Sequence, residues 1–308
     1  MSDDLIKILD GNTFVVSDGR GDIQASPTDP TGLFSFDTRF LSTWVLTVDG
    51  HRLNTLSVGD LQYFETRFFL VPGKGTVYVD AKLSVIRRRA VRDGFHEWLK
   101  ILNHDDKPVE LSVRIEAGSD FADLFEVKDA LKKKGRYSSR VEDGRLLLAY
   151  ERQAYRRSTV ISATAGARVD EEGLTFDVRI QPHGEWTTEI DVAASLPRVQ
   201  RRGGRRSPTG KRRKEDMESN LRRWIGDAPR LECDWEQLRV TYRRSLVDLA
   251  ALRFSLPITP GKSLPAAGLP WFMTMFGRDS IFTSLQALPF NAELAATTLR
   301  VLGLWQGP

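Results

Sequence analysis

Hydrophobic and polar residues alternate with a period of two from residue 11 to about residue 195. The clearest examples are residues 109–117, 174–180 and 186–192, and residues 43–48 and 76–85 have the same strand-like composition. Successive side chains of a β-strand point to opposite faces of a sheet, so each stretch has one apolar and one polar face. Many such strands in succession predict a large antiparallel β-sandwich with its apolar faces turned inward.

Short turn signals separate these stretches. Most of them place a glycine after aspartate, proline or histidine, as at Asp18-Gly19, Asp49-Gly50, Pro72-Gly73, Asp93-Gly94, Asp143-Gly144 and His183-Gly184. Such dipeptides are typical of tight connections between antiparallel strands. No alternation of strands with helices is visible here, so a parallel α/β sheet is not expected.

From residue 215 the hydrophobic period becomes that of helices. We expect a short helix from Glu215 to Ile225 and a second helix capped by Asp234, with Gln237 three residues further on. A third helix is expected to begin near Asp279–Ser280 and to end at Pro289, and a fourth to run from Asn291 to Trp305. The residues expected to face inward are Trp235, Leu238, Tyr242, Leu246 and Leu249, then Ile281, Phe282, Leu285 and Leu288, then Leu294, Thr298, Val301 and Trp305.

A basic run separates the two halves of the chain. Its cations are Arg201, Arg202, Arg205, Arg206, Lys211, Arg212, Arg213 and Lys214. Glycine and proline interrupt the run, and no apolar period accompanies it, which indicates an exposed, mobile linker. Nucleic acid is an unlikely partner despite this charge, because no aromatic residues interleave the cations and no nucleic-acid motif is present. We therefore predict a sandwich domain at 1–198, a linker with a short helix at 199–232, and a helical domain at 233–308.

The remaining composition excludes several classes of protein. The 308 residues carry a net charge of +4 and one cysteine, Cys233, so an internal disulfide is impossible and a reducing compartment is indicated. The longest apolar runs are far shorter than a membrane span needs, and the acidic start, Met1 to Asp4, lacks signal-peptide features. These observations predict a cytoplasmic protein with no membrane partner.

One stretch near the end of the sequence suggests chemistry. Trp271 and Phe272 follow a Gly-Leu-Pro turn, and Arg278 and Asp279 follow Phe276-Gly277. Aromatic faces stack on the C–H groups of a sugar ring, while a cation and an anion exchange hydrogen bonds with its hydroxyls. The alternative is that Arg278 and Asp279 form a structural pair at the start of a helix. The pattern alone supports both interpretations equally.

The motif around these residues resembles a known family. Ala267 to Phe272, followed by Phe276 to Ser280, is similar to the opening of the catalytic domain in bacterial amylo-α-1,6-glucosidases, which are related to glycogen debranching enzyme. Further matches occur in the same order along the first half: Asn12 to Phe14, Ser17 to Asp22, Gly32 to Phe34, Asp37 to Leu41, Phe95 to Glu97, Asn103-His104 and Asp120 to Val127.

This resemblance implies a fold and an activity. The implied fold is an N-terminal sandwich followed by an (α/α)6 toroid, of which only the first helices lie within these residues. The implied activity is the inverting hydrolysis of α-1,6-glucosidic branch stubs of glycogen-like α-glucans. Inverting hydrolysis needs two carboxyl groups, and the family places them in later loops, beyond residue 308. Asp279 does not suit the acid role, since the adjacent Arg278 stabilises its ionised form. We expect Arg278 and Asp279 to hold the terminal glucose, and Trp271 and Phe272 to stack on it. We also expect that these 308 residues alone are inactive and expose apolar helix faces.

Charged residues in the other motifs also have structural interpretations. Asp37 and Arg39 are expected to pair and to hold the loop between Phe34 and Leu41. Asp120, Asp123 and Glu126 are spaced by three residues, which suits a helical turn better than a calcium loop. The four histidines lie far apart without a partner at zinc-ligand spacing, so no metal and no cofactor are expected.

Two other functions remain open. An α-glucoside phosphorylase-like enzyme would share the sandwich and toroid and would release a sugar phosphate. A non-catalytic carbohydrate-binding or interaction module would bind glycogen or amylopectin without turnover.

Overall fold

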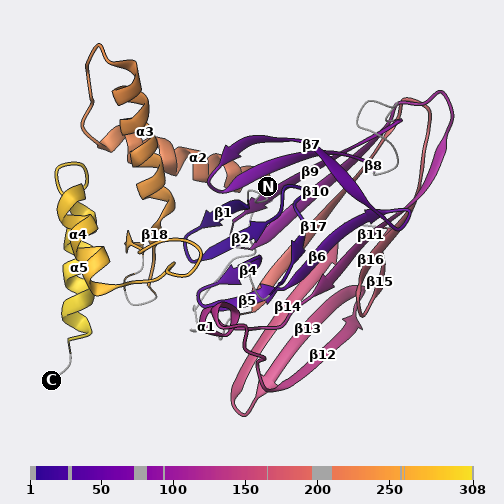
Figure 1. Ribbon diagram of the computed structural model, residues 1–308, viewed down its shortest axis with the longest axis horizontal. Coiled ribbons are helices and arrows are strands. Elements are labelled where there is room, and N and C mark those ends of the chain that lie inside the picture. Colours follow the sequence, from indigo (N-terminus) through magenta and orange to yellow (C-terminus); the bar gives the residue numbers. More distant parts are fainter. Residues whose placement is uncertain are drawn as a thin grey trace. The chain divides into compact units, whose positions relative to one another are not determined.

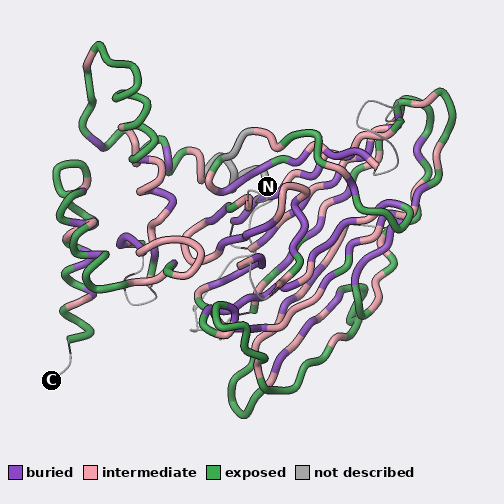
Figure 2. Tube along the Cα trace, viewed as in Figure 1, coloured by how far each residue is buried: buried purple, intermediate pink, exposed green. Residues whose placement is uncertain are grey.

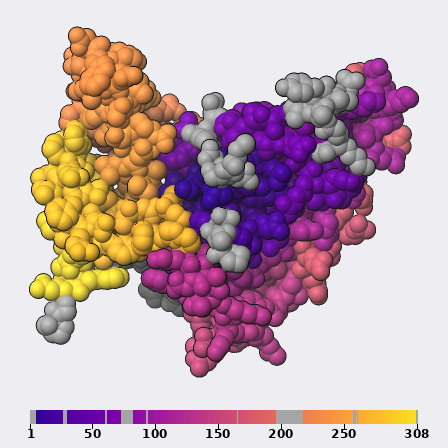
Figure 3. All heavy atoms as spheres, viewed as in Figure 1, coloured from indigo at the N-terminus to yellow at the C-terminus, as the bar shows by residue number. Residues whose placement is uncertain are grey.

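The computed structural model describes residues 5–26, 30–72, 82–92, 94–164, 166–195, 210–256, 259 and 261–306. The chain divides into two compact units, Met1–Pro197 and Arg198–Pro308. The first unit consists of antiparallel strands and one short helix, and the second contains four helices within the described ranges (Figure 1). The space-filling view shows the first unit from indigo to pink and the second in orange and yellow (Figure 3).

A thirteen-stranded sheet forms most of the first unit. Its order is β12-β13-β14-β17-β10-β9-β8-β7-β6-β11-β16-β15, and β3 pairs with β6. The strands are β3 (Ile23–Gln24), β6 (Thr43–Val48), β7 (His51–Gln62), β8 (Glu65–Pro72), β9 (Leu83–Val91), β10 (Phe95–Asn103), β11 (Val109–Gly118), β12 (Arg136–Glu142), β13 (Arg145–Arg152), β14 (Tyr155–Ala163), β15 (Arg168–Asp170), β16 (Gly173–Ile180) and β17 (Glu185–Ser195).

A second, four-stranded sheet belongs to the same unit. It has the order β1-β2-β4-β5 and consists of β1 (Ile6–Asp10), β2 (Thr13–Ser17), β4 (Gly32–Ser35) and β5 (Thr38–Leu41). The short helix α1 (Leu124–Lys128) follows β11. A β-bridge between Thr38 and Asp123 joins β5 to the start of this helix.

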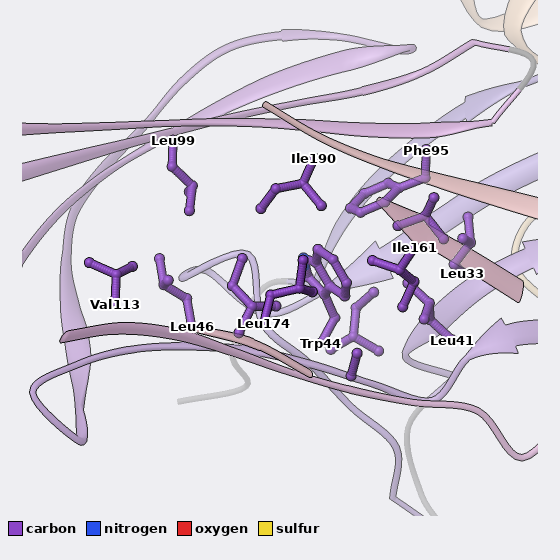
Figure 4. Close-up of a cluster of buried hydrophobic side chains, with 14 of the residues drawn as sticks. Leu33, Leu41, Trp44, Leu46, Phe95, Leu99, Val113, Ile161, Leu174 and Ile190 are labelled. Carbon is purple, nitrogen blue, oxygen red and sulfur yellow. The ribbon is translucent and has the colours of Figure 1, made fainter. Parts of the chain in front are cut away.

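The hydrophobic core lies between two layers of the large sheet. Residues of β10, β14 and β17 face residues of β6, β11 and β16, and the β6–β7 hairpin connects the two layers (Figure 4). At the centre, the Trp44 and Phe95 rings meet edge to face with their centroids 5.7 Å apart. Burying one large apolar side chain contributes about 1.5–3 kcal/mol to the free energy of unfolding, so the core between the two layers is the main source of stability in the unit.

The observed alternation confirms the predicted β-sandwich. Along β10 and β11, buried residues alternate with more exposed ones, as the purple and pink bands of Figure 2 show. The prediction for residues 43–48 coincides with β6, and residues 109–117, 174–180 and 186–192 fall within β11, β16 and β17. Most of the predicted stretch 76–85 lies outside the described residues.

The second unit contains two pairs of contacting helices. Its elements are α2 (Gly210–Asp227), α3 (Glu236–Ala251), β18 (Arg253–Phe254), β19 (Leu264–Pro265), α4 (Gly277–Ala287) and α5 (Ala292–Leu304). The Trp224 indole nitrogen donates to the Leu246 carbonyl oxygen at 3.0 Å and so ties α2 to α3. The Ser284 and Thr298 hydroxyls lie 2.9 Å apart between α4 and α5.

Two helix starts differ from the prediction. Helix α2 begins at Gly210, before the predicted Glu215, so residues 211–214 of the basic run are helical and not part of a linker. Residues 199–209 of the predicted linker lie outside the described part of the chain. The N-cap of α3 is Trp235 and not Asp234, and no side chain caps this helix.

The predicted inward face of α4 is wrong. Ile281, Phe282, Leu285 and Leu288 are exposed, and Phe282 and Leu285 are each 61% accessible. The helix instead buries Ser280, Ser284 and Ala287. These small residues let α4 approach α5 closely, and the Ser280 hydroxyl donates to the Pro265 carbonyl oxygen at 2.8 Å. The packed face is therefore small and partly polar.

The predicted faces of α3 and α5 are only partly correct. Leu246 of α3 is buried, whereas Trp235 and Leu238 are exposed. In α5, Leu294, Thr298 and Val301 are buried as predicted, but Trp305 is the C-cap and is 61% accessible. A helical period shows which residues share a face, but neighbouring elements decide whether that face is covered. No helix in the described ranges is long and apolar enough to cross a membrane.

Candidate functional site

The loop before α4 carries the first two residues of the predicted site. Gly268 and Phe272 exchange two backbone hydrogen bonds, of 3.0 and 2.9 Å, and thereby close a tight turn that contains Trp271. Gly268 has a φ of +147°, a conformation that glycine adopts most easily. The Leu269–Pro270 peptide bond in this turn is cis. Trp271 is half-buried and Phe272 exposed, so the turn presents an aromatic surface.

A third aromatic residue joins this surface. The Phe272 ring meets the Phe276 ring edge to face, with centroids 5.3 Å apart. Phe276 is the N-cap of α4, so the contact connects the aromatic turn to the start of that helix. Phe276 belongs to the sequence motif but was not among the residues expected to contact the sugar, although it lies four residues after Phe272.

The charged residues of the predicted site lie in the first turn of α4. Arg278 and Asp279 are both exposed, and among the described residues no ion pair joins them. Consecutive residues of a helix point in different directions, so adjacent side chains do not face each other. The geometry therefore does not support a structural pair. Asp279 lies in the first turn of α4, and both side chains are exposed to solvent.

Two of the sequence motifs meet in a buried network inside the sandwich. The Glu97 carboxylate accepts hydrogen bonds from Arg87 Nε at 2.9 Å, from Arg89 Nη2 at 2.6 Å and from the Trp44 indole nitrogen at 3.1 Å. Arg87 also donates to the Asp22 carboxylate at 2.7 Å. These four charged side chains are almost completely buried. The network thus holds the turn that ends at Asp22 against β9 and β10.

The pKa values of the two buried arginines shift in opposite directions. Burial lowers the pKa of Arg89 to about 10, although Glu97 acts to raise it. For Arg87, burial also acts to lower the pKa, but the carboxylates of Glu97 and Asp22 outweigh it and raise the pKa above its ordinary value. Because the network is closed to solvent, it offers no access to a ligand, and its contacts are those that hold β9, β10 and the turn before Asp22 together.

Arg39 has a different partner from the one predicted. It binds the Asp120 carboxylate through Nε, at 3.0 Å, and through Nη2. Asp37 accepts a hydrogen bond from the Thr38 hydroxyl at 3.0 Å. The predicted pairing of Asp37 with Arg39 is therefore wrong. The true partner lies far away in the sequence, where a local pattern cannot indicate it.

The carboxylates of the Asp120 motif have structural roles. Asp123 caps α1 by accepting from the backbone of Phe125 and Glu126, and the Glu126 side chain accepts from the Asp123 backbone in return. Glu126 also pairs with Lys133 at 2.7 Å. The spacing of three residues is thus a capping box, as the helical interpretation expected. No group of three or more potential metal ligands occurs among the described residues.

Comparison with known families gives the class of the protein. The family model for the N-terminal domain of (some) glycogen debranching enzymes matches residues 8–191, which is more than half of the chain. The chain therefore belongs to this family. The matched region corresponds to the sandwich, and the family supports a carbohydrate-related role. A search of curated proteins finds no match to the chain.

Similar solved structures share only a distant likeness. A candidate aldose 1-epimerase from Escherichia coli K12 is 6% identical, covers 63% of this chain and 99% of its own, and has a TM-score of 0.40. A candidate kojibiose phosphorylase from the human microbiome is 9% identical, with a TM-score of 0.39 over 72% of this chain and 29% of its own. A galactose mutarotase related enzyme from Lactobacillus acidophilus is 10% identical, with a TM-score of 0.36 over 62% of this chain and 97% of its own. These values are too low to support an argument about function.

Proposed function

We propose that this chain is part of a glycoside hydrolase of the glycogen-debranching type, which hydrolyses the α-1,6-glucosidic branch stubs of glycogen-like α-glucans. The observation that carries this proposal is the family match over residues 8–191. The motif from Ala267 to Ser280 supports it, because the half-buried Trp271 and the exposed Phe272, Arg278 and Asp279 lie at one turn and one helix start.

In this proposal, four residues position the terminal glucose. Trp271 and Phe272 provide the apolar surface on which the sugar ring stacks, and the contact between Phe272 and Phe276 holds that surface beside α4. Arg278 donates hydrogen bonds to sugar hydroxyls, and Asp279 accepts them. Such contacts fix the orientation of the bond that is cleaved.

The proposed reaction is inverting and needs a general acid and a general base. In inverting enzymes the two carboxyl groups stand about 6.5–9.5 Å apart, with a water molecule between the base and the sugar. We place this pair outside the 308 residues, so these residues bind the branch stub but do not cleave it. We propose the cytoplasm as the compartment, since the single cysteine suits a reducing environment.

A binding and turnover experiment tests the proposal. The 308-residue chain is titrated with maltotriose that carries an α-1,6-linked glucose stub, and glucose release is followed in parallel. We expect binding without steady glucose release. Arg278→Gln and Asp279→Asn should each weaken binding about tenfold, since each removes a charge-assisted hydrogen bond. Arg300→Gln, an exposed arginine of α5, is the matched control and should bind as the unmodified chain does.

Other outcomes identify the alternatives. Steady glucose release would contradict the placement of the catalytic pair outside these residues. Phosphate-dependent release of glucose 1-phosphate would instead identify a phosphorylase-like enzyme. Binding that is insensitive to both substitutions, without turnover, would favour a non-catalytic carbohydrate-binding module.

A further inference from the structure

A hollow of about 540 Å³ opens on the solvent face of the large sheet, opposite the hydrophobic core. Strands β8, β9, β10 and β17 form its floor, and Thr164, just after β14, contributes to its edge. Its volume lies within the range of typical small-ligand sites. None of its lining residues belongs to the site proposed around α4.

The strand register arranges the side chains of this hollow in rows. One row across the four strands consists of Arg67, Arg88, Trp98 and Glu189, each paired with its neighbour on the next strand. In a sheet these positions project from the same face and lie about 4.8 Å apart from strand to strand. The row therefore presents cations, an indole and a carboxylate side by side.

The centre of the row is fixed in place. The Glu65 carboxylate accepts two hydrogen bonds from Arg88, at 2.7 and 3.0 Å. This bidentate contact holds the Arg88 guanidinium 4.8 Å from the centre of the Trp98 ring. Trp98 remains half-exposed in this position. An indole with a defined orientation needs little reordering when an apolar ligand surface packs against it.

The two ends of the row carry unused hydrogen-bonding capacity. Within the described ranges, neither Arg67 nor Glu189 has an ion-pair partner, and Arg67 is exposed. A ligand over the row can thus accept hydrogen bonds at one end and donate them at the other. Sugar hydroxyls do both, and the C–H face of a sugar ring suits the indole between them.

The charge balance favours a neutral ligand over a phosphate. The three cations of the hollow are Arg67, Arg88 and Lys100. Arg88 is paired with Glu65, and Lys100 is paired with Glu185 at 2.8 Å. Glu65 also pairs with the buried Arg92. Arg67 and Glu189 offset each other, so the ends of the row provide no net charge to hold an anion.

We propose that this hollow is a second carbohydrate-binding site, which takes a neutral oligosaccharide with Trp98 as its apolar contact and with Arg67 and Glu189 as its hydrogen-bonding ends. The choice of an α-glucan as the natural ligand rests on the proposed function. A site on the sandwich would hold a branched polymer at a point separate from the residues that position the branch stub.

Calorimetric titration of the full 308-residue chain with maltoheptaose tests this inference. Trp98→Ala should lower the affinity about tenfold, and Arg67→Gln and Glu189→Gln about fivefold each. Arg145→Gln, an exposed arginine at the start of β13, is the control and should leave the affinity unchanged. If Trp98→Ala lowers the melting temperature strongly, the affinities of Arg67→Gln and Glu189→Gln test the site instead, because both substitutions change polar groups on the surface of the sheet.

The outcomes separate this inference from the proposed function. Unchanged affinity in Arg67→Gln, Glu189→Gln and a folded Trp98→Ala would overturn the hollow as a site and leave the proposal for Arg278 and Asp279 intact. If inorganic phosphate or glucose 1-phosphate binds more tightly than maltoheptaose, and Arg67→Gln abolishes that binding, the proposal that the ligand is neutral is contradicted. Trp98-dependent binding of xylohexaose or mannohexaose without binding of maltoheptaose would support the hollow and contradict the α-glucan assignment.

Discussion

Glu97 connects two buried arginines and a tryptophan in the first unit. Its carboxylate accepts from Arg87, Arg89 and Trp44, and none of the three charged side chains is accessible to solvent. The cost of taking these charges out of water is offset only while every partner is present. Such a network is therefore sensitive to the loss of a single member.

We predict that Glu97→Gln destabilises the chain by about 3–5 kcal/mol, because it leaves buried guanidinium charge uncompensated. Urea denaturation followed by circular dichroism measures this loss. Glu151→Gln is the control, since Glu151 pairs with Arg156 on the surface, and its cost should stay below about 0.5 kcal/mol. Equal effects of the two substitutions would contradict a structural role for the network.

A second ion pair makes stability depend on pH. Arg114 of β11 donates to the Asp170 carboxylate of β15 at 2.8 Å, and this hydrogen bond lowers the pKa of Asp170 below its ordinary value of 3.8. A carboxyl with a lowered pKa in the folded state stabilises the protein above its unfolded pKa. That contribution is lost as the pH falls through the folded pKa.

The free energies of unfolding of the unmodified chain and of Asp170→Asn should therefore differ at pH 7 and converge as the pH falls below 3.8 and through the folded pKa. The difference at pH 7 should be roughly 0.5 kcal/mol, because Asp170 is partly exposed to solvent. Chemical denaturation at several pH values measures it. A difference that stays constant from pH 7 to pH 2.5 would contradict the role of Asp170.

At the scale of elements, local signals predicted strands well and helix packing poorly. The strand predicted at residues 43–48 matches the bounds of β6, although Trp44, Val45 and Leu46 are all buried and both faces of the strand are covered. The fourth helix was expected to start at Asn291, and Asn291 is the N-cap of α5, where its side chain accepts from the Leu294 backbone at 3.2 Å. The prediction of which face of α4 is buried was wrong, because the sequence does not show which neighbouring elements cover a helix.

Asn291→Ala should destabilise the second unit by about 1 kcal/mol, since it removes this cap and leaves a backbone N–H without its partner. Asn291→Ser keeps an oxygen that can cap and should cost much less. Thermal unfolding of the two variants, followed at 222 nm, measures the difference. Equal melting temperatures for the alanine and serine variants would show that the cap contributes nothing.

The separation of residues along the chain explains which of the sites could be predicted from the sequence. The aromatic and charged residues of the α4 site lie within nine positions of one another, so a linear motif contains them. Arg39 and Asp120 are 81 positions apart, and the row from Arg67 to Glu189 draws on four strands. Only the strand register brings such residues together, and the register does not follow from a local pattern.

At the scale of the whole molecule, exposed apolar residues gather on the helices of the second unit. Phe282 and Leu285 of α4 are three positions apart, lie on the same helix face and are both exposed. Leu288 and Ile281 extend this surface and are also exposed. A contiguous apolar surface of this kind favours association with another surface.

We predict that the 308-residue chain self-associates as its concentration rises and that the double substitution Phe282→Ser with Leu285→Ser shifts it toward the monomer. Size-exclusion chromatography with light scattering measures the mass. The control is Phe125→Ser, which removes an exposed aromatic residue from α1 of the first unit. A monomer at every concentration, or equal masses for the double variant and the unmodified chain, would contradict this prediction.

Native electrophoresis in gels that contain glycogen measures whether this chain binds α-glucans. We expect glycogen to slow the unmodified chain relative to a gel without polysaccharide. Combining Trp98→Ala with Asp279→Asn should restore most of the mobility. Unchanged mobility in glycogen, together with retardation by duplex DNA that disappears when residues 201–214 are deleted, would contradict α-glucan binding and identify a nucleic-acid-binding chain.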